Sequence, residues 1–469
     1  MTIFSNTTPK GQTGNYKTIV YFICLIAALG GLLFGLDQGF IANSLETIES
    51  VYHLGIAGGE KYSATLASGG VLGALLSGLF ARFLGRKKSL VFAGFIFSIA
   101  SLISAFLPPI AILSTCRFAL GFAVGISSFI VPLYLSETAP AKIRGSMGSL
   151  FQLMITIGIF LVAVTNVTIA KIFVTPTVVL PLMFLVITLF AVLMFCGCLF
   201  LPESPRWLML KGKKERTLQN LKKVLNTQEE IDLEIQEIEA TLAESKEKNL
   251  KIVFNGFFLK VLLIGVFLQV FQQLVGINVM IYYAPTIFGY AGMTGLIAML
   301  AVPTVNVLFT IPAVRLVEKW GRKKLLHVGA VFMLIAMTAA GLAFQSIGSV
   351  NDPTLIPSTP KLILLLAAVT YIFGFAVSWG PVAWIVCSEI FPLKGREIGM
   401  TITTMVNWTF AGLVMRYSLS FMHHFGNHAL FYLFATFCIL AIIFVTKFVP
   451  ETKGITLEAL EHKLKKKKL

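Results

Sequence analysis

The sequence has little charge for its length. Asp, Glu, Lys and Arg make up only 13 % of the 469 residues, whereas 56 % are hydrophobic, and the mean hydropathy is +0.84. A water-soluble domain needs a much larger charged fraction to cover its surface. The composition therefore excludes an ordinary soluble protein and indicates one that resides in lipid.

Residues that carry catalysis or bind metals are few and are not grouped. The six cysteines, at positions 24, 116, 196, 198, 387 and 438, all fall inside apolar runs, and the six histidines lie in loops or near the ends of such runs. We interpret Cys196 and Cys198 as small buried hydrophobic residues and not as metal ligands. Because the sequence contains no nucleophile constellation, phosphate-binding loop or metal cluster, we predict a protein that is not an enzyme and needs no cofactor.

Long apolar runs are abundant. Each is long enough to cross a hydrocarbon core about 30 Å thick as a helix. The sequence therefore predicts an all-α membrane protein with twelve transmembrane helices, and the long first run argues against a cleaved signal peptide. The twelve predicted spans lie roughly at 18–47, 62–84, 88–107, 110–136, 146–169, 177–201, 256–289, 294–317, 323–346, 360–388, 397–421 and 428–449.

The net charge of +16 is unevenly distributed. Clusters of Lys and Arg follow the even-numbered spans, whereas the opposite connections, such as 347–359, hold almost none. This is the positive-inside pattern, which predicts that both termini are cytoplasmic. The basic balance therefore indicates a membrane orientation and no nucleic-acid partner, and the lysine-rich tail at 463–468 is expected to meet anionic lipid headgroups.

The chain divides into two halves that repeat each other. Gly85-Arg-Lys-Lys recurs at Gly321, Gly121-Phe-Ala-Val at Gly374, Ser136-Glu at Ser388 and Pro202-Glu-Ser at Pro450 as Pro-Glu-Thr, with offsets from 236 to 253. Parallel repeats of this kind are typical of secondary carriers whose halves rock about a site in the middle of the membrane. The predicted organisation is an N-terminal tail (1–17), a six-helix half (18–201), a cytoplasmic linker of two or three short amphipathic helices (202–255), a second six-helix half (256–449) and a basic cytoplasmic tail (450–469).

The seventh span carries an unusual number of polar residues, in the stretch LQVFQQLVGINVMIYYAP at 268–285. On an unbroken helix Gln269, Gln272 and Gln273 share a face, and Asn278 points away from it. The four amides converge only if the helix is interrupted at Gly276, and interrupted spans are pointers to the binding sites of carriers. Neutral amides both donate and accept, which suits an uncharged ligand rich in hydroxyls, such as a sugar. The alternative is that the amides only join neighbouring helices.

Further polar and aromatic positions extend this candidate site. Gln152 is a lone amide in the fifth span, Asn407 and Trp408 interrupt the apolar run of the eleventh, and Trp384 follows a Gly380-Pro break in the tenth. We interpret Trp384 as a surface for the apolar face of a pyranose, whereas a Trp that only anchors the protein at the membrane interface is the alternative.

Ionisable residues deep in the spans are rare, which makes Asp37 and Arg117 notable. They lie about 15 Å and about 10 Å from the same side, close enough to pair. A buried Asp whose pairing changes meets the requirement for a proton carrier, and a static ion pair is the alternative. At the cytoplasmic ends, Glu137 with Arg144, Glu318 with Arg322 and Glu389 with Arg396 are expected to form ion pairs between the halves that close a gate; signals for membrane orientation alone are the alternative.

Taken together, these motifs resemble the sugar porter family of the major facilitator superfamily, and bacterial galactose–proton and arabinose–proton symporters in particular. The resemblance covers essentially the whole chain. It rests on GGLLFGLD (30–37), GRKK (85–88), YLSETAPAKIRGS (134–146), PESPRWL (202–208), QQLVGINVMIYYAP (272–285), WGRKK (320–324), WGPVAWIVCSEIFPLKGRE (379–397), NW (407–408) and PETKG (450–454).

The resemblance implies a major facilitator fold of two pseudo-symmetric halves, and proton-driven import of a monosaccharide, a hexose such as galactose or glucose, by a monomer. It implies that Asp37 couples the proton, that Arg117 modulates it and that the Glu and Arg residues above form the gate. A facilitative uniporter and a non-transporting sugar sensor are the alternatives. The residues implied in sugar binding are Gln152, Gln272, Gln273, Asn278, Trp384 and Asn407, with Tyr282, Gly380 and Trp408 nearby.

The sequence departs from the family pattern in three places. Arg82 and Phe83 replace the usual Asp-Arg pair of the loop after the second span, which puts the charge contact there in doubt. The sixth span lacks a Trp-Arg pair that many members carry. Asn407 stands where some xylose symporters have Gln, which favours a hexose over xylose.

Overall fold

The protein is an all-helical bundle in a computed structural model that describes residues 18–140, 143–245, 256–348, 356–392 and 395–453. Twelve helical segments in these ranges are long and apolar enough to cross a membrane, as predicted. Helices are the natural form of such runs because every backbone hydrogen bond is satisfied within the segment.

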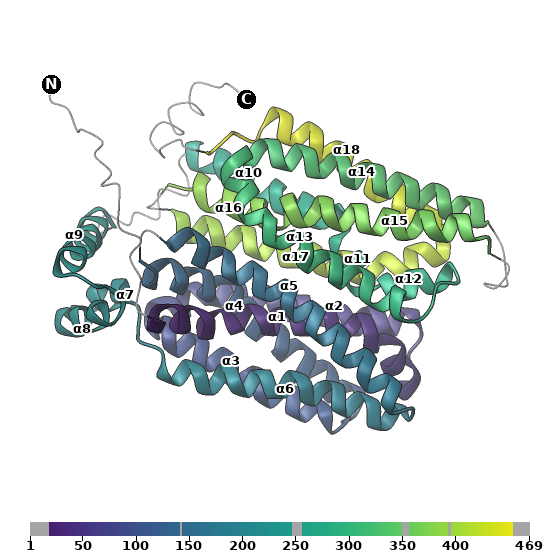
Figure 1. Cartoon of the computed structure of the whole chain (residues 1–469), viewed down its shortest axis with the longest axis horizontal. Helices are drawn as coiled ribbons and strands as arrows, with labels where there is room; N and C mark the ends of the chain where they lie inside the picture. The colour runs from purple at the N-terminus through teal and green to yellow at the C-terminus, as the bar shows by residue number, and fades with distance from the viewer. Residues whose placement is uncertain (1–17, 141–142, 246–255, 349–355, 393–394, 454–469) are drawn as a thin grey trace.

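The first half contains six long helices and is followed by three short ones. Their bounds are α1 (Thr18–Tyr52), α2 (Ile56–Phe83), α3 (Arg86–Ala105), α4 (Ile110–Thr138), α5 (Arg144–Ile172) and α6 (Pro176–Phe200), then α7 (Pro205–Leu210), α8 (Lys214–Val224) and α9 (Gln228–Ser245). The short helices lie outside the bundle at one end (Figure 1). We call this end the linker side and the opposite end the far side.

The second half repeats the arrangement with two interrupted spans. The seventh span is broken into α10 (Gly256–Leu274), α11 (Ile277–Tyr282) and α12 (Ala284–Tyr290). The tenth consists of α15 (Ser358–Gly374), a π-helical turn η3 (Phe375–Trp379) and α16 (Gly380–Ile390). The remaining helices are α13 (Leu296–Trp320), α14 (Arg322–Ile347), α17 (Arg396–Phe425) and α18 (Asn427–Lys447). The helix α17 runs without a break through Asn407 and Trp408, so these residues interrupt only its hydrophobicity.

Small residues allow close packing of the helices. A Cβ atom added at Gly35 of α1 would collide with the backbone of Ile155 in α5, and one at Gly121 of α4 would collide with the backbone of Leu66 in α2. Close backbone approach is the usual means of helix association in lipid, where apolar side chains gain little from burial against each other. The halves meet along α2 with α17 and α5 with α13, and α11 packs on α1.

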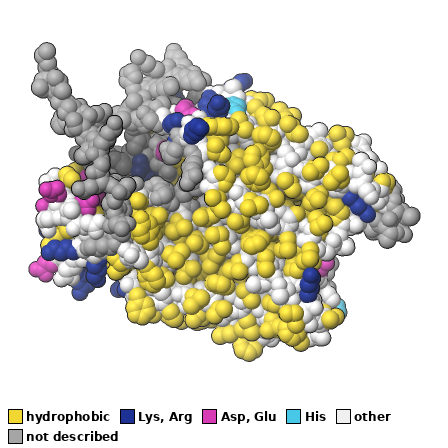
Figure 2. Space-filling view, viewed as in Figure 1, with side chains coloured by type: hydrophobic (Ala, Val, Ile, Leu, Met, Phe, Trp, Pro, Cys, Tyr) yellow, Lys and Arg dark blue, Asp and Glu magenta, His cyan; other side chains and the backbone are white. Residues whose placement is uncertain are grey.

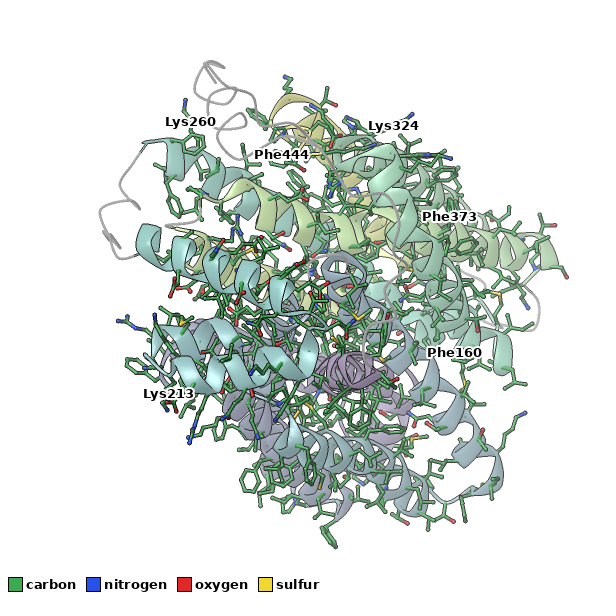
Figure 3. All side chains as sticks on the ribbon, turned by 60° about the vertical axis from the view of Figure 1, so that its left-hand side comes forward. Phe160, Lys213, Lys260, Lys324, Phe373 and Phe444 are labelled. Carbon is green, nitrogen blue, oxygen red and sulfur yellow. The ribbon has the colours of Figure 1, made fainter. Side chains whose placement is uncertain are left out.

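The surface fits a membrane environment. On the face that Figure 2 shows, hydrophobic side chains cover the long side of the bundle, and charged side chains lie toward its two ends and on α7–α9. Large apolar residues such as Phe106, Ile172 and Leu189 are exposed. Lys213, Lys260 and Lys324, from the linker, α10 and α14, lie at the periphery (Figure 3).

Candidate functional site

The predicted break in the seventh span is present at Gly276. This residue lies between α10 and α11 with φ +98°, in the left-handed region that favours glycine. A Cβ atom here would also lie 2.6 Å from the Phe434 ring. The break turns Asn278 back toward α10, where its Nδ2 donates a hydrogen bond to Gln273 Oε1.

A buried amide network joins α10 to α16 and α17. Asn407 Nδ2 donates to both Gln272 Oε1 and Gln269 Oε1, each at 2.6 Å. Gln272 Nε2 in turn donates to the Trp379 carbonyl at 2.9 Å and to the Gly380 carbonyl at 3.3 Å. Both carbonyls lie where the π-helical turn ends and α16 begins. The structure therefore brings together Gln272, Gln273, Asn278, Gly380 and Asn407.

Aromatic residues border this network. Trp408 is buried, with its ring centroid 5.3 Å from that of Phe34, so it links α17 to α1. Tyr282 is also buried, and its hydroxyl has no hydrogen-bond partner among the described residues. The side chains of Gln152 and Trp384 are half-buried and are not part of the hydrogen-bonded network.

Asp37 and Arg117 form a fully buried ion pair, as their predicted depths suggested. Arg117 Nη1 donates to Asp37 Oδ1 at 2.6 Å, and neither side chain is exposed. Within the described part of the chain, Asp37 Oδ2 and Arg117 Nε and Nη2 have no hydrogen-bond partners. The Arg117 guanidinium lies 5.7 Å from the Tyr62 ring centroid. A buried ion pair with unused hydrogen-bonding groups is costly. Ionisable residues of this kind within a membrane are candidates for a functional role.

A carboxylate clamp holds the linker side of the first half. Glu203 Oε1 accepts from the backbone amides of Arg86 at 2.9 Å and Lys87 at 3.1 Å, the first residues of α3. A carboxylate is favourable there because the first amides of a helix lack helical partners and carry a partial positive charge. Gly85, with φ +89°, precedes the helix, and a Cβ atom at this position would collide with the Glu203 carboxylate. Arg86 also binds Glu137 through two hydrogen bonds of 2.7 and 2.8 Å.

The second half repeats this clamp. Glu451 Oε1 and Oε2 accept from the amides of Arg322 at 2.9 Å and Lys323 at 3.1 Å, after Gly321 with φ +86°. The Arg322 side chain binds Glu389 with hydrogen bonds of 2.8 and 3.2 Å. The hydroxyls of Ser204 and Thr452 donate to Glu137 and Glu389, respectively.

The two clamp glutamates differ in their proton affinity. Burial raises the pKa of Glu203, against the opposing effect of the surrounding amides and Arg86. Burial acts in the same direction on Glu451, but the amides of Lys453, Arg322, Lys323 and Thr452 outweigh it and hold the pKa of Glu451 below its ordinary value.

Two of the glutamates expected at the gate have described ion-pair partners. Glu137 pairs with Arg86 and Glu389 pairs with Arg322, and both of these pairs lie within one half. The side chains of Arg144 and Glu318 lie outside the described residues. Arg396 is described, and its Nε has no hydrogen-bond partner among the described residues.

Sequence reasoning missed several residues at these sites. Gln269 was visible as one of three amides on a helix face, but nothing in the sequence indicated its bond to Asn407. Glu203 and Glu451 were visible only as members of the repeated Pro-Glu-Ser/Thr motif. Their repetition beside two Gly-Arg-Lys-Lys segments was the available signal for a shared contact.

Two equivalent six-helix halves around a buried polar layer define a secondary carrier with the major facilitator fold. The profile of the family described as "Sugar (and other) transporter" matches residues 23–464. The chain therefore belongs to this family of sugar transporters, and it is a multi-pass protein of the cell membrane.

Individual relatives agree with this placement over nearly the full chain. The galactose-proton symporter of Escherichia coli is 38 % identical over 97 % of both chains. The glucose transporter GlcP of Staphylococcus epidermidis is 34 % identical over 96 % of this chain and 98 % of its own. Among solved structures, the proton:xylose symporter XylE bound to 6-bromo-6-deoxy-D-glucose has a TM-score of 0.80 and 32 % identity, covering 95 % of this chain and 99 % of that one.

Proposed function

We propose that the protein imports a monosaccharide together with a proton by alternating access, and that the sugar is a hexose such as galactose or glucose. The observation that carries this proposal is the pairing of two sites within one bundle. One is a layer of neutral amides on α10, α11 and α17, and the other is the buried Asp37–Arg117 pair on α1 and α4. The galactose- and glucose-transporting relatives support the substrate class.

The amide layer suits a sugar because its groups both donate and accept and carry no net charge. Gln272, Gln273, Asn278 and Asn407 contribute amides from two sides of the Gly276 break. Gln152 of α5, on the other half, contributes a further amide. Trp384, Trp408 and Tyr282 offer apolar ring faces, and the Tyr282 hydroxyl has no hydrogen-bond partner among the described residues. Gly380 offers a carbonyl.

The ion pair suits proton coupling. A proton on Asp37 removes its charge and weakens its interaction with Arg117. The attraction between α1 and α4 at this point is then smaller. Sugar and proton bind from outside, the halves rock, and both leave to the cytoplasm. Glu137, Glu389, Arg322 and Arg396, together with Arg144 and Glu318, are proposed to regulate closure on that side.

The proposed orientation places the linker side in the cytoplasm, with both termini there, because the basic clusters lie on that side. We propose that the carrier works as a monomer in the lipid bilayer and has no nucleic-acid partner.

The test is uptake of radiolabelled galactose, glucose, xylose and arabinose into transporter-deficient cells, for the parent protein and for Asp37→Asn. We expect the parent to accumulate a hexose above its external concentration and an uncoupler to abolish this accumulation. Asn has the size of Asp but is neutral and cannot carry a proton. The Asp37→Asn variant should therefore lose accumulation but retain exchange of sugar across the membrane.

The same experiment separates the alternatives. A parent protein that only equilibrates sugar, with Asp37→Asn unchanged, would identify a facilitative uniporter in which Asp37 is structural. Absence of uptake for all four sugars, with the protein present in the membrane, would favour a sugar sensor.

A further inference from the structure

Glu60 is a buried carboxylate that connects the two halves on the far side. It lies near the start of α2 and is fully buried. Its hydrogen bonds come from α17, in the other half: the amides of Leu419 and Ser420 donate to Oε1 at 2.6 and 3.0 Å, and the Ser420 hydroxyl donates to Oε2. Arg416 Nη1 of the same helix lies 3.7 Å from Oε2. One acidic side chain therefore binds three donors and faces one cation across the interface.

The turn of α17 that Glu60 contacts is also held from its own half. In a regular α-helix, the Leu419 amide donates a hydrogen bond to the Met415 carbonyl, four residues earlier. The Tyr283 hydroxyl, from the junction of α11 and α12, donates to that carbonyl at 2.7 Å. Both ends of one helical donor–acceptor pair therefore have partners from outside the helix. This turn of α17 is a contact point at which α2 and the broken seventh span meet.

The packing beneath Glu60 explains how a carboxylate reaches a helix backbone. A Cβ atom at Gly412 of α17 would lie 3.0 Å from that of Ala67, and one at Gly70 of α2 would lie 2.6 Å from the Trp408 ring. Small residues thus keep α2 and α17 close together along this face.

We propose that Glu60 is the residue that fastens the far side of the carrier: its bonds to α17 stabilise the state closed on that side, and they must break for the far side to open. Hydrogen bonds to a carboxylate are about twice as strong as neutral ones, and opening exchanges all of them for water. This inference rests on the alternating-access function proposed above. It adds a residue, outside the proposed sugar and proton sites, that sets the equilibrium between the states closed and open on the far side.

The test is a distance measurement between spin labels in the purified full-length protein, without sugar. The labels replace Ser50 and His423, exposed at the far-side ends of α1 and α17, and a second pair replaces Lys88 and Lys324, exposed on the linker side. The background has the six native cysteines replaced. Glu60→Ala should increase the population with the longer far-side distance by about tenfold, the effect of losing a charged hydrogen bond or more.

Three comparisons make the result specific. Glu60→Gln keeps one acceptor oxygen and should shift the population less than Glu60→Ala. Ser420→Ala should add little to Glu60→Ala, because its partner is already absent. The exposed Glu46→Ala on the same side should leave both distances unchanged. Rocking of the halves also requires the Lys88–Lys324 distance to shorten as the far-side distance grows.

The proposal is overturned if Glu60→Ala leaves the far-side distances as in the parent, or if it broadens them with no change on the linker side, which would be local loosening of α17. Neither readout depends on which sugar is carried or on proton coupling. Failure of the proposed transport function in the uptake assay is therefore distinguishable from failure of this inference.

Discussion

At the scale of single residues, Asn407 has the most demanding position in the polar layer. Its one amide nitrogen donates to two glutamine oxygens from α10, Gln269 and Gln272, each at 2.6 Å. This arrangement uses both protons of the nitrogen on protein partners and leaves its oxygen for a ligand. In the proposed site, this fixes the orientation of the Asn407 amide before a sugar arrives and so lowers the entropic cost of binding.

Replacing Asn407 with Ala is expected to raise KM for the transported sugar by about tenfold or more, because two buried acceptors lose their donor. The measurement is the concentration dependence of initial uptake. Thr409→Ala is the matched control: it lies on the same helix, is exposed, and its hydroxyl bonds only to the Met405 carbonyl. An unchanged KM in Asn407→Ala, at equal amounts of protein in the membrane, would remove Asn407 from the binding site.

At the scale of helices, the same carboxylate clamp is present in both halves on the linker side. In each, a glutamate that follows the last span of the half caps the helix of the third span. The equivalent glutamates nevertheless differ: the ionised form is disfavoured by burial at Glu203 and favoured by backbone amides at Glu451. Glu451 therefore stabilises the fold at neutral pH, and this contribution is lost as pH falls through its lowered pKa. The penalty for ionising Glu203 is relieved as pH falls.

We expect Glu451→Gln to lower the melting temperature at pH 7 more than Glu203→Gln, because the neutral amide replaces a favoured charge at one position and a disfavoured charge at the other. The loss at Glu451 should be about 1.5–3 kcal/mol, the range for hydrogen bonds to a charged group. Thermal unfolding of the purified variants in detergent measures both. Equal losses, or a larger loss at Glu203, would contradict this assignment of charge.

The sequence predicts the twelve spans well, but it predicts only one of the two irregularities within them. Long runs of apolar residues locate the spans because length and hydropathy are local properties. The break at Gly276 was predictable since four amides needed to converge. The π-helical turn at Phe375–Trp379 was not, because it depends on packing: the Trp379 indole donates to the Leu326 carbonyl of α14 at 2.9 Å. The pairs of Glu137 with Arg86 and of Glu389 with Arg322 were not predicted for the same reason, since these arginines are distant in sequence.

At the scale of the whole molecule, each half contains its own clamp, and the halves meet through long helix pairs within one shared hydrophobic core. We therefore expect residues 1–245 and 256–469, produced as two chains in one cell, to associate and restore sugar uptake. Co-purification through a tag on one chain, together with uptake, provides the measurement. Each chain produced alone serves as the control. Association without uptake would show that the covalent linker takes part in transport.

The repeat that relates the halves does not extend to the Glu60 contact. The helix equivalent to α2 is α13, which begins Leu296-Ile-Ala-Met-Leu and has no acidic residue before Glu318, near its linker-side end. Of the α2–α17 and α5–α13 seams, only α2–α17 has a carboxylate tie on the far side among the described residues. In the proposed mechanism, two duplicated halves are therefore fastened asymmetrically on the far side, at the α2–α17 seam and not at the α5–α13 seam.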